Sequence, residues 1–239
     1  MQIYFIRHAQ SENNHLFDLN GSSQGRNDDP DLTVVGEKQA RLLFEYFVNN
    51  HSQVKIIKDD LNLSGYSFTH LYTSPMIRAI KTAWRIARNL ELPLQVIMDI
   101  HEGGGIFLEN EEKELVGLPG KPKSYFMKNF PGLLLDQEMD ETGWWNRPFE
   151  PYEIRKPRAK KVIQYLLENH NDNDQIALFS HAGFFNYFLS ALLNYDESER
   201  VRFNINNTSI SRIDIEKSSN ITKILYINQI SFLPNELIT

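Results

Sequence analysis

The chain has 239 residues, of which 41% are hydrophobic and 23% charged, a composition that excludes a disordered or fibrous protein. It contains no cysteine, which excludes a disulfide framework, a thiolate nucleophile and a cysteine-ligated metal. The net charge of -6 disfavours nucleic acid as a partner. No apolar run approaches the roughly 18 residues of a membrane span, and no secretory signal opens the chain, so we expect a cytoplasmic protein with no membrane partner.

Strands alternate with helices along most of the chain. In chain order we expect a strand at 3–6, a loop at 11–31, a helix at 33–48, a strand at 68–73, a helix at 75–89, a strand at 94–98, a helix at 153–169, a strand at 175–180, a helix at 183–193 and two strands at 209–215 and 221–228. Such alternation predicts an α/β fold, a three-layer sandwich whose mostly parallel sheet has helices on both faces.

The segment at about 103–150 differs from the rest of the chain. It combines three consecutive glycines, an acidic stretch and a region rich in Pro, Gly, Lys and aromatic residues. We therefore predict one domain over residues 1–239, with this segment as an insertion that acts as a lid and sets specificity. The residues expected to face the substrate from it are Lys121, Lys123, Trp145 and Arg147. The alternative is that the tryptophans are core residues and the lysines are solvated.

Polar side chains follow four of the predicted strands. In chain order these are Arg7-His8, the helix that bears Arg78, His101-Glu102 and Ser180-His181-Ala182-Gly183. Ligands of open α/β sheets bind outside the carboxyl ends of the strands. We therefore expect these groups to meet at one edge of the sheet, although each short motif by itself is common in proteins without any catalytic role.

This set of side chains suits a phosphate monoester. Arginine binds phosphate oxygens bidentately and stays charged, and the helix that begins at Ala182 and Gly183 should offer free backbone N–H groups to an anion. A histidine can attack phosphorus, and a carboxyl group can protonate the leaving oxygen. Because arginine and histidine supply the charge stabilisation, this chemistry requires no metal and no cofactor.

The motifs together resemble the histidine phosphatase superfamily, also called phosphoglycerate mutase-like. Its Arg-His-Gly-x-Ser/Thr-x-x-Asn block is similar to Arg7-His8-Ala9-Gln10-Ser11-Glu12-Asn13-Asn14, and its Leu-Thr-x-x-Gly-x-x-Gln-Ala block to residues 32–40. Ser-Pro-x-x-Arg-Ala-x-x-Thr-Ala matches residues 74–83, Ser-His-x-Gly matches residues 180–183, and Asn-x-Ser matches residues 207–209. Alanine replaces the usual glycine at position 9 and a frequent glycine at position 182. The resemblance covers nearly the whole chain outside about 105–146.

By position, the resemblance implies that His8 is the phosphorylated nucleophile and is neutral when it attacks. It further implies a phosphate pocket formed by Arg7, Arg78 and His181, with a hydrogen bond from Asn14 or Ser11.

The resemblance also implies a general acid after the third strand, and Glu102 is the best candidate. Asp99 and Glu109 are alternatives. His181 completes the catalytic set and would serve best as a cation, so the pocket would hold groups in opposed protonation states.

We expect a metal-independent phosphatase that acts on a small phosphorylated metabolite through a phosphohistidine. A phosphoglycerate mutase is the alternative, although glycolytic mutases carry an Arg-His-Tyr-Gly block after the acid, where this chain has Gly103-Gly104-Gly105. A non-catalytic module that binds a phosphorylated ligand is an alternative of another class. A metalloenzyme is disfavoured because the chain has no His-Glu-x-x-His motif and no cysteine cluster. The sequence does not indicate the oligomeric state.

Overall fold

Six strands form the central sheet of the protein, whose computed structural model describes residues 1–49, 59–195 and 201–239. They are β1 (Gln2–Arg7), β2 (His70–Thr73), β3 (Leu94–Val96), β6 (Gln175–Ser180), β7 (Ile210–Glu216) and β8 (Ile221–Gln229). Across the sheet the order is β3-β2-β6-β1-β7-β8. The strands from β3 to β1 run parallel, β7 is antiparallel to β1, and β8 is antiparallel to β7. The prediction of a mostly parallel sheet is confirmed.

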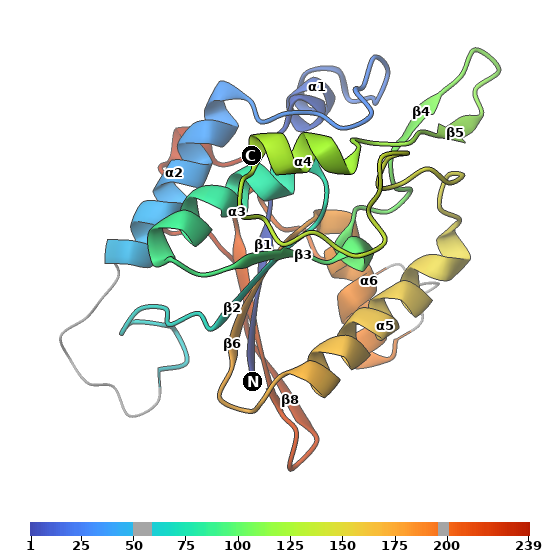
Figure 1. Cartoon of the computed structure of the whole chain (residues 1–239). Helices are drawn as coiled ribbons and strands as arrows, with labels where there is room; N and C mark the ends of the chain where they lie inside the picture. Colours follow the sequence, from blue (N-terminus) through green and yellow to red (C-terminus); the bar gives the residue numbers. More distant parts are fainter. Residues whose placement is uncertain (50–58, 196–200) are drawn as a thin grey trace.

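Helices cover both faces of this sheet (Figure 1). One face carries α2 (Val34–Asn49) and α3 (Ile77–Leu90), and the other carries α5 (Tyr152–Asn169) and α6 (Ala182–Leu193). Among the described residues, no helix has the length and apolar character needed to cross a membrane.

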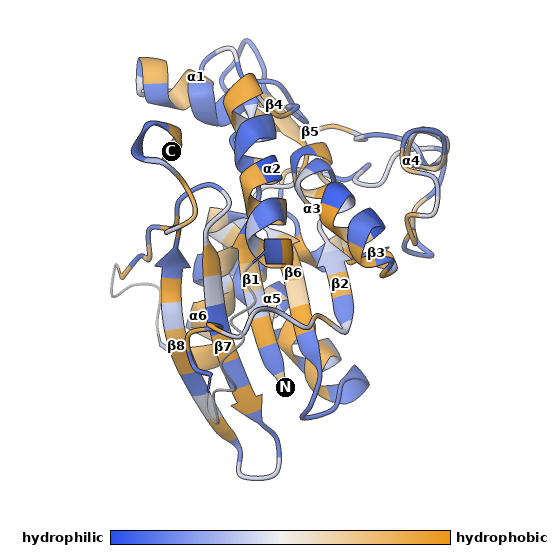
Figure 2. Cartoon of the chain, turned by 90° about the vertical axis from the view of Figure 1, so that its left-hand side faces the viewer, coloured by the Kyte–Doolittle hydropathy of each residue, from blue (hydrophilic) through white to orange (hydrophobic). Residues whose placement is uncertain are grey.

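Strand β1 shows why both faces need a cover. Tyr4 and Ile6 belong to the core on the side of α2 and α3, whereas Ile3 and Phe5 pack on the side of α5 and α6, and all four are fully buried. A central parallel strand is apolar on both faces because helices pack on each. Figure 2 shows hydrophobic residues concentrated along β1 and β6. The predicted three-layer arrangement is confirmed.

The prediction of a continuous loop at residues 11–31 is wrong. Residues Glu12–Asn20 form helix α1, for which Ser11 is the N-cap. The Ser11 hydroxyl accepts a hydrogen bond from the backbone N–H of Asn14, and the Asn14 side chain accepts one from the backbone N–H of Ser11. This reciprocal pair is a capping box with asparagine in place of the usual Glu or Gln, so the polar composition concealed a helix start.

The 103–150 segment contains a hairpin of β4 (Phe107–Glu109) and β5 (Leu115–Gly117) and a short helix, α4 (Lys123–Asn129). Its later part is attached to the edge of the central sheet, because Leu134 donates to the Leu94 carbonyl and accepts from the Val96 N–H. Phe126, Trp144 and Trp145 are buried in the core beside α3. Part of the segment is therefore built into the hydrophobic core.

Candidate active site

The backbone of His8 is held on both sides at the carboxyl end of β1. Its N–H donates to the Ser180 carbonyl on the β6 side (2.9 Å). Its carbonyl accepts from the side-chain amide of Asn207 (2.8 Å), which lies just before β7. The imidazole is 3% exposed. The predicted nucleophile thus directly follows a strand that is paired on both sides, by β6 and β7.

Two contacts fix the tautomer of His8. Its Nδ1 lies 2.7 Å from the Ala9 carbonyl oxygen, which can only accept, so Nδ1 carries the proton. The guanidinium Nε of Arg78 donates to the other ring nitrogen, Nε2, at 3.2 Å. Burial, and then the charges of Arg78 and Arg7, hold the pKa of His8 well below its ordinary value. The ring is therefore neutral, with the lone pair of Nε2 directed into the cavity wall formed by Arg78.

Arg78, in the first turn of α3, is itself buried and oriented by Asp29. Its NH1 lies 3.7 Å from Oδ1 of Asp29, and that carboxylate oxygen also accepts from the Ile77 N–H (3.2 Å). Asp29 is fully enclosed, and burial raises its pKa to about 6 although Arg78 acts in the opposite direction. Sequence reasoning missed Asp29, because nothing in a run of Asn, Asp and Pro shows which carboxylate points inward.

The side chains of Arg7 and His181 complete the pocket. Arg7 donates to the Ile205 carbonyl (2.6 Å), and its buried Nε has no hydrogen-bond partner among the described residues. The ring centroids of His8 and His181 are 5.0 Å apart, and Nε2 of His181 lies 2.8 Å from the Ser74 hydroxyl.

The expectation that His181 serves as a cation toward phosphate stays a prediction. Burial, followed by the charge of Arg78 and the neighbouring His8, keeps the pKa of His181 well below its ordinary value. A phosphate dianion between these side chains would act in the opposite direction, because an opposite charge favours the protonated ring.

Glu102 lies at the N-terminus of α6. Its carboxylate accepts from the N–H groups of Gly183 (3.1 Å) and Phe184 (3.0 Å). The helix N–H groups expected to be free for phosphate are therefore paired with Glu102. A Cβ on Gly183 would come within 2.2 Å of the Glu102 carboxylate, so a larger residue at this position would require Glu102 to move.

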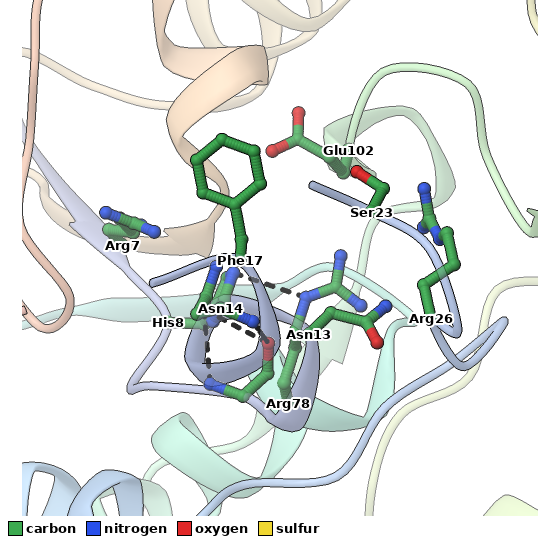
Figure 3. A pocket seen from close by; sticks show the side chains of 10 residues that line it. Arg7, His8, Asn13, Asn14, Phe17, Ser23, Arg26, Arg78 and Glu102 are labelled. Carbon is green, nitrogen blue, oxygen red and sulfur yellow. Dashed lines mark hydrogen bonds between the residues drawn. The ribbon is translucent and has the colours of Figure 1, made fainter. Parts of the chain in front are cut away.

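The pocket formed by these groups is a cavity of about 200 Å³ (Figure 3). Its lining comprises Arg7, His8, Ser11, Asn13, Asn14, Phe17, Ser23, Arg26, Arg78 and Glu102. The structure thus brings together at one cavity His8, Glu102, Arg7, Arg78, Ser11 and Asn14 of the predicted site, with His181 directly beside it. These residues lie at one cavity because the strand ends that carry them meet at one edge of the sheet, as predicted.

Arg26 is a cavity residue that sequence reasoning missed. It lies across the cavity from Arg7 (Figure 3). Its guanidinium stacks over the ring of Phe107 at 4.1 Å. Its Nε is buried and has no hydrogen-bond partner in the described part of the chain. Three arginines therefore face a cavity whose only carboxylate among the lining residues is that of Glu102.

Ser11 and Asn14 serve the architecture of the site as well as lining it. Oδ1 of Asn14 accepts from the Ser11 hydroxyl (3.0 Å) and from the Asn207 side chain (3.2 Å). Oδ1 of Asn14 is thus occupied by hydrogen bonds within the protein. The side-chain nitrogen of Asn14 is the group that can donate a hydrogen bond to a ligand.

The four predicted lid residues Lys121, Lys123, Trp145 and Arg147 do not line the cavity around His8. Trp145 and Arg147 instead line a separate cavity of about 550 Å³ next to α5. Arg147 is exposed and stacks on the ring of Trp145 at 4.5 Å. A role for these four residues in a substrate-bound form stays a prediction.

Asp99 lines the same separate cavity of about 550 Å³, and Glu109 is an exposed residue of β4, so neither alternative acid faces His8.

The chain belongs to the histidine phosphatase superfamily, branch 1, whose sequence profile matches residues 3–228. The family and its structural neighbours support a phosphatase or a mutase. A comparison with curated proteins finds no significant match.

Solved structures of phosphatases share the fold. A phosphoserine phosphatase from Entamoeba histolytica in complex with 3-phosphoglyceric acid is 18% identical, with a TM-score of 0.59 and coverage of 98% of this chain and 99% of that one. An alpha-ribazole phosphatase from Shigella flexneri is 17% identical, with a TM-score of 0.59 and coverage of 96% of each chain. A mycobacterial glucosyl-3-phosphoglycerate phosphatase is 14% identical, with a TM-score of 0.57 and coverage of 96% of this chain and 99% of that one.

Proposed function

We propose that the protein is a phosphatase that hydrolyses the phosphate monoester of a small molecule through a phosphohistidine at His8. The observation that carries the proposal is the state of that ring. It is buried, neutral and protonated on Nδ1, with Nε2 in contact with Arg78 at the floor of a cavity that holds three arginines. A neutral imidazole beside cations is a competent nucleophile toward a phosphate dianion, because the cations compensate the charge of the substrate.

In the first step Arg78 transfers its hydrogen bond from Nε2 to a phosphoryl oxygen, the freed lone pair of Nε2 attacks phosphorus, the N–P bond forms, and the bond from phosphorus to the ester oxygen breaks. Arg7, Arg78 and His181 hold the three equatorial oxygens, and Glu102 gives its proton to the leaving alcohol. In the second step water attacks the phosphohistidine, Glu102 takes back a proton, and orthophosphate leaves with His8 restored. For the first step the Glu102 carboxyl group must be protonated and released from the N–H groups of α6.

The cavity supports a small substrate. A volume of about 200 Å³ accommodates a phosphoryl group and a few further atoms. The residues beyond the phosphate pocket come from α1 and the following loop, and include Asn13, Phe17 and Arg26. We propose that these lining residues, and not the whole segment, recognise the alcohol part of the substrate. Structural neighbours have been crystallised with 3-phosphoglyceric acid and phosphoserine, both of which are small phosphate esters.

The test is phosphate release from a small aryl phosphate in the presence of EDTA, with wild type, His8→Ala and His15→Ala. His15 is an exposed residue of α1 and serves as the matched control. We expect activity in the wild type and the control, and a loss of about 10⁴-fold or more in His8→Ala, as when other enzymes lose their nucleophile.

A phosphoryl group trapped on the wild type during turnover, stable to base and labile to acid, should be absent from His8→Ala. Equal rates in wild type and His8→Ala would contradict the assignment of the nucleophile. If none of the three proteins releases phosphate, a mutase assay with a bisphosphoglycerate primer separates a strict mutase from a binding module.

A further inference from the structure

The opposite ends of the same parallel strands hold a second histidine cluster, outside the site described above. His70 is the first residue of β2, His170 follows the end of α5, and Asp174 directly precedes β6. Each offers a ligand atom within 4.8 Å of those of the other two. Figure 1 shows the turn between α5 and β6 at the end of the sheet where the N-terminus lies, away from α1.

A hydrogen-bond chain orients His70. Its Nδ1 lies 2.8 Å from the Thr69 hydroxyl. That hydroxyl donates to the Gln175 carbonyl (3.2 Å) and accepts from the Gln175 N–H (3.0 Å). The Thr69 hydroxyl donates its own proton to the Gln175 carbonyl. Toward His70 its oxygen is therefore the acceptor, and Nδ1 of His70 carries the proton that it donates to this oxygen. This leaves Nε2 of His70 as the nitrogen with a free lone pair.

His170 is oriented in the complementary sense. It is 3% exposed, and its Nε2 lies 3.0 Å from the Tyr72 hydroxyl. Its Nδ1 points to Oδ2 of Asp174 at 3.3 Å. Because a carboxylate oxygen only accepts, Nδ1 carries the proton and donates it to Asp174, while Nε2 accepts from the Tyr72 hydroxyl. A metal ion that displaces the Nδ1 proton would leave the neutral ring with its proton on Nε2, donating to Tyr72, and with the Nδ1 lone pair on the side of Asp174 and His70, whose ring centroid is 4.4 Å away.

We propose that His70, His170 and Asp174 form a binding site for a divalent transition metal ion, with zinc as the ion that fits best. The ligands are Nε2 of His70, Nδ1 of His170 and a carboxylate oxygen of Asp174. Two imidazoles and one carboxylate favour zinc over magnesium or calcium, which require mostly oxygen ligands. Hydrogen bonds from the second nitrogen of each ring, to Thr69 and to Tyr72, are the outer contacts that fix metal-binding histidines.

The geometry requires only a small adjustment. Ligand atoms around a tetrahedral zinc lie about 3.3 Å apart, since each is about 2.0 Å from the metal. His70 and Asp174 are only partly buried, so rotation of their side chains can close the distance, and solvent can reach the fourth position. The bound ion would tie the start of β2 to the turn before β6. It would have a structural role and take no part in turnover.

The sequence does not reveal this site. His70 and His170 are separated by 100 positions, so no short metal-binding motif links them, and a search for His-Glu-x-x-His or paired cysteines passes over them. The parallel pairing of β2 with β6, which sets His70 opposite Ile176, brings them together.

The experiment is equilibrium dialysis of the full chain against zinc chloride, with bound metal measured by mass spectrometry. We expect one zinc ion per wild-type chain. Affinity should fall at least 100-fold in His70→Ala and in Asp174→Ala, and 10- to 100-fold in Tyr72→Phe, which removes only the outer contact to His170. The control His15→Ala should bind zinc as the wild type does.

Two results would overturn the proposal. One is zinc binding that is equal in wild type, His70→Ala and Asp174→Ala, or absent from the wild type. The other is zinc that is lost in His8→Ala and kept in His70→Ala, which places the ion in the catalytic cavity. Anomalous diffraction at the zinc edge from a soaked crystal gives an independent location. Circular dichroism of each variant verifies that the fold is kept, and the outcome does not depend on whether the protein is a phosphatase.

Discussion

The two ends of the parallel strands use histidine in opposite surroundings. At the carboxyl ends of β1 and β6, His8 and His181 face arginines. At the amino ends of β2 and β6, His70 and His170 face the carboxylate of Asp174. Cations around an imidazole keep it unprotonated and suit it to attack an anion. A carboxylate beside two imidazoles instead creates a net negative site that suits a cation. The fold supplies the proximity at both ends, and the charge of the neighbours decides the chemistry.

Among changes to the surroundings of the histidines, the largest expected effect comes from removing the cation next to His8. Arg78→Ala eliminates the contact to Nε2 and one of the charges that lower the pKa of His8. We expect kcat/KM for an aryl phosphate to fall about 10³-fold, a few kcal/mol, as when one transition-state donor is lost. The acid limb of the kcat/KM profile should move up toward the ordinary histidine pKa of 6.5, and orthophosphate should inhibit more weakly.

Arg85→Ala is the matched control, because Arg85 is an exposed residue of the same helix. It should leave kcat/KM, the pH profile and the inhibition constant unchanged. An acid limb that stays in place in Arg78→Ala would mean that burial alone, without the charge of Arg78, keeps His8 neutral.

The second effect is on stability. Burial holds the pKa values of His8, His101 and His181 well below 6.5 in the folded chain. The unfolded chain binds these protons below pH 6.5 and the folded chain does not, so stability is present above pH 6.5 and is lost as the pH falls. At pH 5.5 the three rings together cost about 4 kcal/mol. Asp29, whose pKa is raised to about 6, has the opposite sign and offsets about 1 kcal/mol of the total.

The free energy of unfolding, measured by urea titration with EDTA, should therefore be about 3 kcal/mol lower at pH 5.5 than at pH 7.5. His101→Gln should reduce this difference by about 1 kcal/mol, whereas His15→Gln should leave it unchanged. Equal stability at the two pH values would show that the buried rings take up protons without unfolding.

The sequence was sufficient for the layers, for most strands and helices, and for the residues on motif positions, because these depend on local patterns. Short continuous apolar runs predicted β1 and β6, and the spacing from Ser74 to Arg78 placed the arginine in the first turn of α3. Helix α1 was missed because asparagine takes the place that Glu or Gln usually holds in a capping box.

Asp29, Arg26 and the metal-binding cluster could not be predicted for a different reason. Whether Asp29 or its neighbour Asp28 is buried depends on the path of a loop against α3, which no periodicity encodes. Arg26 and Phe107 are 81 positions apart and become neighbours only in the folded chain. Contacts between distant segments depend on packing in the folded chain, so short sequence motifs do not predict them.

The smallest expected effect concerns Asp29, which positions Arg78 and does not touch the cavity itself. Asp29→Asn keeps the oxygen that accepts from the Ile77 N–H and removes the charge facing Arg78. At pH 7.5 we expect kcat/KM to fall about 10-fold, since the substitution removes one charge of a buried ion pair whose partner, Arg78, contacts the nucleophile.

The pH dependence is what separates positioning by charge from a purely structural role. Because the pKa of Asp29 is raised to about 6, its negative charge is present above pH 6 and is lost as the pH falls through that value. The wild type at pH 5 therefore resembles the variant, and the ratio of their kcat/KM values should shrink from about 10 toward 1 between pH 7.5 and pH 5. Asp31→Asn is the control, because Asp31 pairs with Lys81 of the same helix at the surface (2.6 Å) and should change neither the rate nor the profile. A ratio that stays constant across this range would mean that Asp29 supports Arg78 by shape alone.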